Sequence, residues 1–443
     1  KFVMYSALIA IRWLLVVLLL PLAAVPAAKG QDAGPPPGEP KKIAALCTVY
    51  GKWHHADVIV TKFLAGMPTD EGLIPPKVRI ASLYIEQGED DLGHKLAAHY
   101  GVPVYPTIAE ALTLGGEELA VDGVLLIGEH GKYPKNQLGQ EMYPRMLMMK
   151  QVVRVFEWSG RVVPVWYDKH LSYNWLDAKW VYDRSKEMEV PMMAGSVIPL
   201  IWRKPTGFEH PPGTEISEAL VLSHGTVDRY AIHALEMLQC MVERRKGGET
   251  GIQEIECVQG DGFVRALRAG RFPMDMIARA LREQADIDVA ARPLDENAGS
   301  HAAILVRYRD GLRATVLLLN GYYSQRWFYA ARVKDEIQTC EFVYLRPPDY
   351  NLFQPVPAFS YLALNIQEMF LTGRPQTPLD RTLLATGASI AAIESRHAGR
   401  ALPTPHLAIS YSAEGFAPIR PKGSAPTGAS IAPWPPEELK SIY

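Results

Sequence analysis

The sequence predicts an α/β fold in which a doubly wound parallel sheet is followed by an α+β domain with an open, largely antiparallel sheet. Continuous apolar runs of strand length at 43–50, 78–85 and 121–127 alternate with segments of helical pattern. Such runs are typical of parallel strands, because helices bury both faces of a parallel sheet. After about residue 215 strands follow one another through short turns, and Asp310-Gly311 is a strong hairpin signal.

In the first domain each apolar run is followed by a segment that can form a helix, and this alternation predicts right-handed βαβ units. The expected strands are 43–50, 78–85, 102–104, 121–127 and 161–165, and the expected helices are 56–65, 91–99, 108–114, 143–158 and 173–188. The second domain is expected to contain a helix at 230–245, strands at 302–308, 312–319, 327–333 and 336–345, and helices at 357–371 and 380–397.

Length and composition limit the class of protein. The chain has 443 residues, so two or three domains are expected at roughly 100–200 residues per domain. Lys and Arg number 46 and Asp and Glu number 48, so there is no basic excess with which to bind nucleic acid. The four cysteines are far apart and form no CxxC pair, which predicts neither a disulfide scaffold nor a zinc site.

Residues 1–28 are typical of a secretory signal or an uncleaved signal-anchor helix. Lys1 and Arg12 precede the apolar run 13–25, and small residues follow it. Positive charge before the run keeps the N-terminus cytoplasmic, so the folded part is expected on the periplasmic side, secreted or tethered to the inner membrane. The expected remaining parts are a Pro/Gly linker at 29–41, domains at 42–205 and 206–412, and an irregular tail at 413–443.

Titratable side chains follow four of the predicted parallel strands. Ligands of open α/β sheets bind beyond the carboxyl ends of the strands, so these loops form the candidate site. The residues are Lys52, His54, His55, Glu86, Glu129, His130, Asp168, Lys169 and His170. The same histidines and carboxylates could bind a metal, but no HxH or HExxH spacing fixes ligands on one element, so no metal site is predicted.

Two segments carry a resemblance to a known family. They are 121–127, which reads VDGVLLI, and 160–172, which contains Asp168-Lys169-His170. Placed in this order before an α+β domain, they resemble the glucose-fructose oxidoreductase/inositol dehydrogenase/rhizopine catabolism (Gfo/Idh/MocA) oxidoreductases, over about residues 42–400. The resemblance implies a Rossmann domain that binds NAD or NADP, with Lys169 beside the nicotinamide and the substrate. It also implies a homo-oligomer.

The resemblance implies a set of cofactor-binding residues, although the phosphate loop departs from the family pattern. The family has G-x-G-x-x-[GA], whereas residues 47–52 contain one glycine, and the Cβ atoms of Thr48 and Tyr50 would crowd a pyrophosphate. Glu86 stands where an acid binds a ribose hydroxyl, which favours NAD over NADP. The implied cofactor-binding residues are Thr48, Tyr50, Gly51, Lys52, Glu86, Gly128, Glu129, His130 and Asp168.

A second motif implies a catalytic histidine. Where the family has D-x-G-x-H-x-x-D, this chain has residues 231–236, so His233 and Glu236 share one face of a helix. The resemblance implies that Lys169 stabilises an oxygen anion and that His233 is the base, assisted or replaced by His170. The side chains expected to bind the substrate are Arg203, Tyr308 and Trp175.

We therefore expect an exported or membrane-tethered NAD(P)-dependent oxidoreductase that acts on a sugar or polyol hydroxyl. Tight retention of the cofactor is expected, because a diffusible nucleotide would be lost outside the cytoplasm. One alternative is a catalytically silent Rossmann-fold subunit of a membrane-associated assembly, which the single-glycine loop and the apolar N-terminus favour. Another is sugar chemistry without net redox on a retained NAD.

Overall fold

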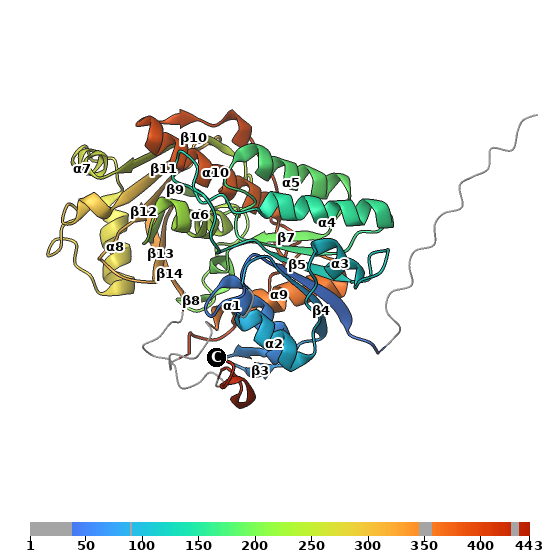
Figure 1. Cartoon of the computed structure of the whole chain (residues 1–443). Helices are drawn as coiled ribbons and strands as arrows, with labels where there is room; N and C mark the ends of the chain where they lie inside the picture. The colour runs from blue at the N-terminus through green and yellow to red at the C-terminus, as the bar shows by residue number, and fades with distance from the viewer. Residues whose placement is uncertain (1–37, 89–90, 345–356, 427–433) are drawn as a thin grey trace, which may run out of the picture. The chain divides into compact units, whose positions relative to one another are not determined.

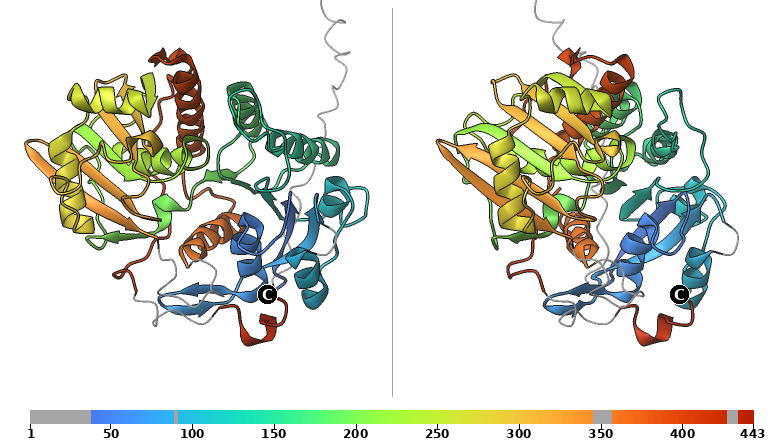
Figure 2. Two further views of the ribbon diagram at one scale, coloured as in Figure 1. Left: turned by 60° about the vertical axis from the view of Figure 1, so that its left-hand side comes forward. Right: turned by 90° about the vertical axis from the view of Figure 1, so that its left-hand side faces the viewer.

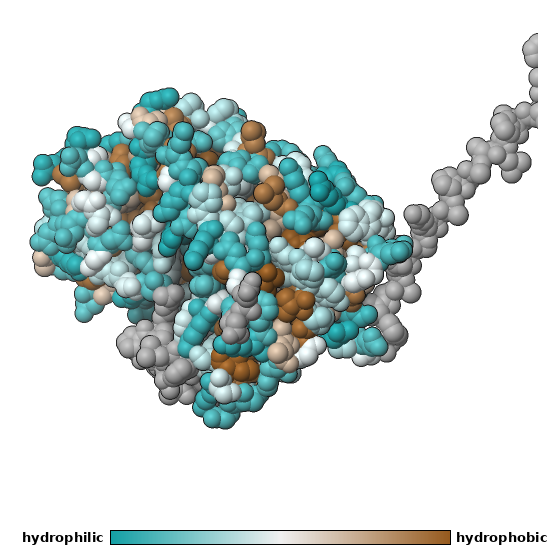
Figure 3. Space-filling model, in the orientation of Figure 1, coloured by the Kyte–Doolittle hydropathy of each residue, from teal (hydrophilic) through white to brown (hydrophobic). Residues whose placement is uncertain are grey.

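The computed structural model describes residues 38–88, 91–344, 357–426 and 434–443. It forms two units, Lys1–Glu39 and Pro40–Tyr443, and the second contains both sheets. The predicted export segment 1–28 lies outside the described residues, as does most of the predicted linker. Within the described ranges no helix has the length and apolar character to cross a membrane. Hydrophilic side chains cover most of the face in Figure 3.

The first sheet is parallel and has the order β4-β1-β5-β6-β7, the doubly wound arrangement that the sequence predicts (Figure 1). Its strands are β1 (Lys41–Cys47), β4 (Val78–Ile85), β5 (Gly123–Ile127), β6 (Val165–Asp168) and β7 (Met192–Gly195). All of β5 is buried, which explains its continuous apolar sequence. The strand order reverses between β1 and β5, and such a reversal opens a crevice at the carboxyl ends.

Helices cover both faces of this sheet. They are α1 (His55–Ala65), α2 (Leu92–Tyr100), α3 (Ile108–Thr113), α4 (Arg145–Ser159), α5 (Trp175–Glu187) and α9 (Ala358–Thr372). Ile43 of β1 packs in a core with α1 and α9, whereas its neighbour Ala44 packs in a second core with α3, α4 and α5. Although α9 follows the second sheet in sequence, it packs against α1 and the short hairpin of β2 (Met67–Thr69) and β3 (Gly72–Ile74).

The second sheet has eight strands in the order β15-β10-β11-β12-β9-β13-β14-β8 and is largely antiparallel, as predicted. The strands are β8 (Trp202–Lys204), β9 (Ile216–Ser223), β10 (Ile252–Gln259), β11 (Ala302–Tyr308), β12 (Arg313–Leu318), β13 (Trp327–Val333), β14 (Glu336–Val343) and β15 (Leu402–Pro403). β9 lies between β12 and β13 and runs parallel to β12.

Two pairs of helices enclose this sheet, as Figure 2 shows. They are α6 (Val227–Val242) with α10 (Leu379–Ala398), and α7 (Asp261–Arg268) with α8 (Met274–Ala285). Val221 of β9 faces α6 and α10, and the next residue, Leu222, faces α7 and α8. The period of two along the strand therefore separates two cores. It also places α6 on the face where the candidate site lies.

Two predicted strands differ from the structure, and each prediction contained a proline, which lacks a backbone N–H. The strand predicted at 161–165 is found as β6, which begins at Val165, directly after Pro164. The strand predicted at 102–104 is reduced to a single bridge between Val104 and β4. β9 and β10 are additional strands that the sequence pattern did not predict.

Leu126→Ala is expected to lower the free energy of unfolding by about 2–5 kcal/mol, because truncating a fully buried side chain of β5 leaves a cavity. Leu176→Ala is the matched control, since that side chain is 80% exposed, and its expected effect is below about 0.5 kcal/mol. Urea unfolding followed by circular dichroism measures both. Equal losses would contradict the central position of β5.

Candidate active site

A cavity lies where the carboxyl ends of the first sheet face helix α6 and strand β13. Its volume is about 540 Å³, which is in the usual range for small-molecule sites. The polar and aromatic side chains that line it are Trp53, His55, Glu129, His130, Tyr143, Lys169, Arg229, Tyr230, His233, Gln325, Trp327, Tyr344 and Phe359. The cavity therefore brings together residues from both sheets.

Lys169 is held at the cavity wall by an ion pair with Glu129. Its Nζ donates to Oε1 at 2.8 Å, and the Arg145 guanidinium binds the other carboxylate oxygen. Burial alone would raise the pKa of Glu129, but the Lys169 and Arg145 charges outweigh it and hold that pKa well below its usual range. Gly128 permits this packing, because a Cβ there would lie 2.7 Å from Cγ of Arg145.

Four residues of the cavity wall have left-handed backbone conformations, which are uncommon outside glycine. The angle φ is 67° at Trp53, 68° at His130, 53° at Lys169 and 57° at Gln325. Such conformations cost about 1–3 kcal/mol each and persist where the surroundings impose them. The ion pair with Glu129 supplies that constraint at Lys169. Backbone strain is thus concentrated at the wall of this cavity, as is typical of functional sites.

A second pair joins the start of α1 to the end of β6. His55 Nδ1 lies 2.7 Å from Asp168 Oδ2. The His130 ring stands 5.4 Å from the His55 ring and stacks on His54 at 4.5 Å. Burial, with a further contribution from His55, lowers the pKa of His130 to about 3. In the part of the chain that the structure describes, no group of His, Cys, Asp and Glu side chains is arranged to hold a metal.

His233 lines the cavity from α6, and a hydrogen bond with Ser196 orients its ring. Its Nδ1 lies 2.6 Å from Ser196 Oγ, and the backbone N–H of Ser196 donates to the buried carboxylate of Glu236. Burial, together with the Lys169 charge, lowers the pKa of His233 well below its usual value, so its imidazole is neutral near pH 7. Because Nδ1 is bound by Ser196, Nε2 is the nitrogen left for a ligand.

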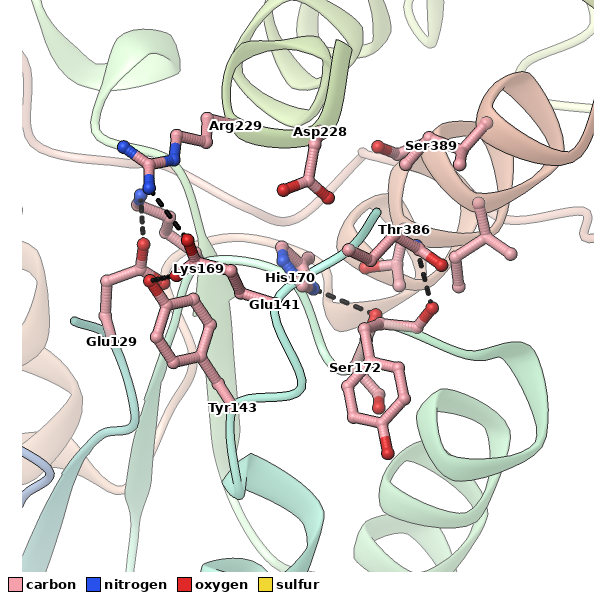
Figure 4. Close-up of a pocket in the computed structure, with 14 residues that line it drawn as sticks. Glu129, Glu141, Tyr143, Lys169, His170, Ser172, Asp228, Arg229, Thr386 and Ser389 are labelled. Atoms are coloured by element: carbon pink, nitrogen blue, oxygen red, sulfur yellow. Dashed lines mark hydrogen bonds and ion pairs between the residues drawn. The ribbon is translucent and has the colours of Figure 1, made fainter. Parts of the chain in front are cut away.

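A smaller pocket of about 20 Å³ adjoins the cavity and shares Glu129, Tyr143, Lys169 and Arg229 with it. Figure 4 shows that Asp228 and Arg229 of α6 lie above the strand-end residues, with Thr386 and Ser389 of α10 to one side. Arg229 donates to Glu141 at 2.9 Å, which ties α6 to the loop before α4.

His170 lies in this smaller pocket and not in the larger cavity, so its expected role as a second base is corrected. Its Nδ1 is 2.9 Å from the Ser172 carbonyl oxygen, and its Nε2 is 3.4 Å from Nη1 of Arg145. Burial, together with the Arg145 charge, lowers the pKa of His170 to about 3. Both ring nitrogens are therefore already bound within the chain.

The side chains expected to hold a diphosphate after β1 are bound within the chain. Thr48 Oγ1 donates to the Glu129 carbonyl oxygen at 2.7 Å. The Tyr50 side chain is fully buried, and its hydroxyl lies 2.9 Å from Thr61 Oγ1 in α1. It therefore packs beneath α1 rather than facing the crevice. Lys52 Nζ donates to the backbone oxygen of Tyr443 at 3.4 Å.

Backbone N–H groups of the same loop also donate hydrogen bonds within the chain. The N–H of Tyr50 donates to Asp91 Oδ2 at 3.1 Å, and the N–H of Trp53 donates to Asp57 Oδ2 at 2.9 Å. A Cβ on Gly51 would lie 2.8 Å from Nδ1 of His54, so that ring covers the glycine. A diphosphate at the start of the helix would need this position. A dinucleotide therefore fits the loop only after the His54 ring leaves Gly51.

Two further parts of the crevice, the end of β4 at Glu86 and the cavity near Lys169, differ in how much space they leave for a ligand. Glu86 is exposed at the end of β4, but its carboxylate accepts a hydrogen bond from Tyr133, and Gln87 accepts one from the Lys132 N–H at 2.9 Å. The loop between β5 and α4 thus reaches across to β4. Near Lys169, in contrast, the cavity has room for a nicotinamide and a small ligand.

The three residues expected to bind substrate lie away from the cavity, which corrects that prediction. The Arg203 guanidinium is buried and donates to the Phe208 carbonyl oxygen at 2.7 Å. The Tyr308 hydroxyl is buried and donates to Gln239 at 2.9 Å. Trp175 packs on α10, with its ring 4.9 Å from that of His406. Each side chain has its partners within the protein.

Sequence reasoning missed Ser196, which binds His233, and several residues of the cavity wall. Ser196 directly follows β7, so the rule that sites lie at strand ends would have found it. Trp327, Tyr344 and Phe359 come from β13, the residue after β14, and α9. No local pattern marks these three aromatic residues, because only the tertiary fold brings their elements to the first sheet.

Glu129→Gln is expected to lower the free energy of unfolding by about 3–5 kcal/mol at pH 7, because it leaves two buried cations without their carboxylate. The pKa of Glu129 in the folded chain lies below its ordinary value of 4.5. The carboxylate therefore stabilises the fold above about pH 4.5, and this contribution is lost as the pH falls through the folded pKa.

Urea unfolding between pH 7 and pH 3 measures this effect, and the gap between wild type and Glu129→Gln is expected to close toward low pH. Glu118→Gln, at an exposed carboxylate, is the matched control and is expected to stay within about 0.5 kcal/mol of wild type. A gap that is constant across the series would argue against the ion pair with Lys169.

No protein-family model and no curated protein matches the sequence. Among solved structures, apo scyllo-inositol dehydrogenase from Lactobacillus casei aligns with a TM-score of 0.50 and 11% identity over 82% of this chain and 98% of that one. GenD2 from gentamicin A biosynthesis, in complex with NAD, aligns with a TM-score of 0.49 and 14% identity over 82% and 96%. At such identities the likeness shows the fold alone: a parallel sheet followed by a largely antiparallel sheet, arranged as in the scyllo-inositol dehydrogenase.

Proposed function

We propose that the chain is an NAD-dependent oxidoreductase that oxidises or reduces a polyol or sugar at the cavity between Lys169 and His233. The observation that carries the proposal is that a cationic side chain and a neutral imidazole from different sheets line one cavity of about 540 Å³. Oxidation of a hydroxyl requires a group that takes its proton and a group that stabilises the oxygen anion. NAD, when bound, supplies the hydride acceptor.

His233 is the proposed base. Burial keeps its imidazole neutral near pH 7, and a neutral imidazole can accept a proton. The base role requires the tautomer in which Nδ1 donates to Ser196 Oγ, since Nε2 then carries a lone pair that can accept the proton of a bound hydroxyl. The Glu236 carboxylate fixes Ser196 through its backbone N–H, so the orientation of the ring is set from the next turn of α6.

Lys169 is the proposed donor to the substrate oxygen. Its ammonium has three N–H groups, and the ion pair with Glu129 uses one of them. The remaining donors can bind the oxygen from which the proton leaves. Because Arg145 shares the Glu129 carboxylate, Lys169 is fixed in position while charge develops on the substrate.

The cavity wall suits a cyclic polyol or a sugar. Trp53, Trp327, Tyr344 and Phe359 supply aromatic faces, and Arg229 and Gln325 supply hydrogen-bonding groups. The Lactobacillus casei neighbour is described as a scyllo-inositol dehydrogenase. We propose a substrate of that general class, and we keep the exported or tethered location as part of the proposal on the basis of residues 1–28.

A second candidate function is a catalytically silent subunit that has kept the fold. The occupied loop after β1 favours it, because the N–H groups of Tyr50 and Trp53 already bind Asp91 and Asp57. Equilibrium dialysis of the purified protein against NAD separates the two functions. Bound nucleotide supports the oxidoreductase, whereas absence of bound nucleotide at millimolar NAD supports the subunit.

Lys169→Met and His233→Phe are each expected to lower the rate of NADH formation by about 10²–10⁴-fold, the usual contribution of one proton-transfer group. Absorbance at 340 nm with a panel of inositols, alditols and aldoses measures the rate. Lys95→Met, at an exposed lysine of α2, is the control and is expected to retain wild-type activity. Unchanged turnover in a folded Lys169→Met variant would remove Lys169 from the site.

A further inference from the structure

The turn between β1 and α1 is covered by two stacked imidazole rings, which we call the imidazole stack (His54 and His130). Their ring centroids are 4.5 Å apart and the ring planes are inclined by 15°. His54 comes from the residue before α1, and His130 comes from the loop after β5. The stack therefore bridges the two strands between which the sheet order reverses, at the point where doubly wound folds bind the diphosphate of a dinucleotide.

Glycine in such a turn normally allows a phosphate to approach the backbone closely. Gly51 is the one glycine of this turn, but the His54 ring occupies the space next to it. A Cβ built on Gly51 would lie 2.8 Å from Nδ1 and 2.9 Å from Cε1 of His54. The close approach that glycine permits is thus used by a side chain of the same loop.

The chemistry of the stack does not favour an anion. Burial lowers the pKa of His54 and lowers that of His130 to about 3, so both rings are neutral near pH 7. The neighbouring carboxylates of Asp57 and Asp91 are bound to backbone N–H groups of the turn. An incoming diphosphate would therefore meet two neutral rings at this position.

His54 is the movable part of this arrangement. The backbone of the turn is fixed by Asp57 and Asp91, and Asp57 is further bound by the Tyr443 hydroxyl. The His54 side chain, in contrast, makes no capping hydrogen bond to α1, and its buried Nδ1 has no hydrogen-bond partner among the described residues. Rotating the ring away breaks no hydrogen bond at that nitrogen.

We propose that the imidazole stack plugs the diphosphate position of the crevice and that His54 sets the affinity of the chain for a dinucleotide. The inference rests on the proposed function, because it concerns the cofactor of the same site. A nicotinamide can enter the cavity beside Lys169 without displacing His54, which does not line that cavity. The adenosine diphosphate half cannot bind until the His54 ring turns away.

Two variants at one position test the plug. His54→Ala removes the ring, whereas His54→Phe keeps an aromatic ring of similar size over Gly51. Isothermal titration calorimetry with NAD and with ADP-ribose measures affinity independently of turnover. His54→Ala is expected to bind both probes about two- to tenfold more tightly than wild type, the effect of removing one aromatic stacking interaction. His54→Phe is expected to bind them no more tightly than wild type.

The outcomes separate this inference from the proposed function. Equal affinity of wild type and His54→Ala for NAD would overturn the plug and leave the oxidoreductase intact. Tighter binding by both His54→Ala and His54→Phe would also overturn the plug, because a ring at that position would then not block the ligand. Failure of all three proteins to bind NAD or ADP-ribose at millimolar concentration would overturn both the plug and the proposed use of NAD.

Discussion

The buried ion pair between Lys169 and Glu129 is the interaction on which the candidate site depends. Burying charges is unfavourable unless they are paired, so the ends of β5 and β6 are held together by their own side chains. Arg145 adds the start of α4 to the same carboxylate. The pairing also supports the left-handed backbone at Lys169. One carboxylate therefore fixes the position of the cation, the adjoining loops and one wall of the cavity.

Much of the fold follows from local sequence patterns. Continuous apolar runs correctly predicted β1, β4 and β5, because full burial on both faces leaves no polar alternation to read. β10 was missed because Gln253, Glu254 and Glu256 interrupt its apolar positions and give no uninterrupted run. The packing of α9 against the first sheet could not be predicted either. Two helices that are distant in sequence can pack together without any local sequence pattern that indicates it.

The part of the candidate site that lies at the ends of the parallel strands could be predicted from the sequence. Lys169, Glu129 and His130 follow parallel strands, and parallel strands end at one edge. The resemblance supplied His233, which indeed lines the same cavity. Arg203 and Tyr308 were predicted to bind substrate, but their polar groups are bound within the protein. The sequence does not distinguish a side chain that binds a ligand from one that binds only other parts of the chain. Nor could the sequence reveal that His54 turns onto Gly51.

The position of β9 has a consequence for how the chain reaches its final state. β9 is made early, yet both of its partners, β12 and β13, lie roughly a hundred residues later, and contacts of such long range slow folding. During synthesis β9 has no strand partner until β12 has been made, and its second edge stays unpaired until residue 333 has been made. The centre of the second sheet can therefore be completed only after β13 has been made, although α6 precedes β12 and β13 in the chain.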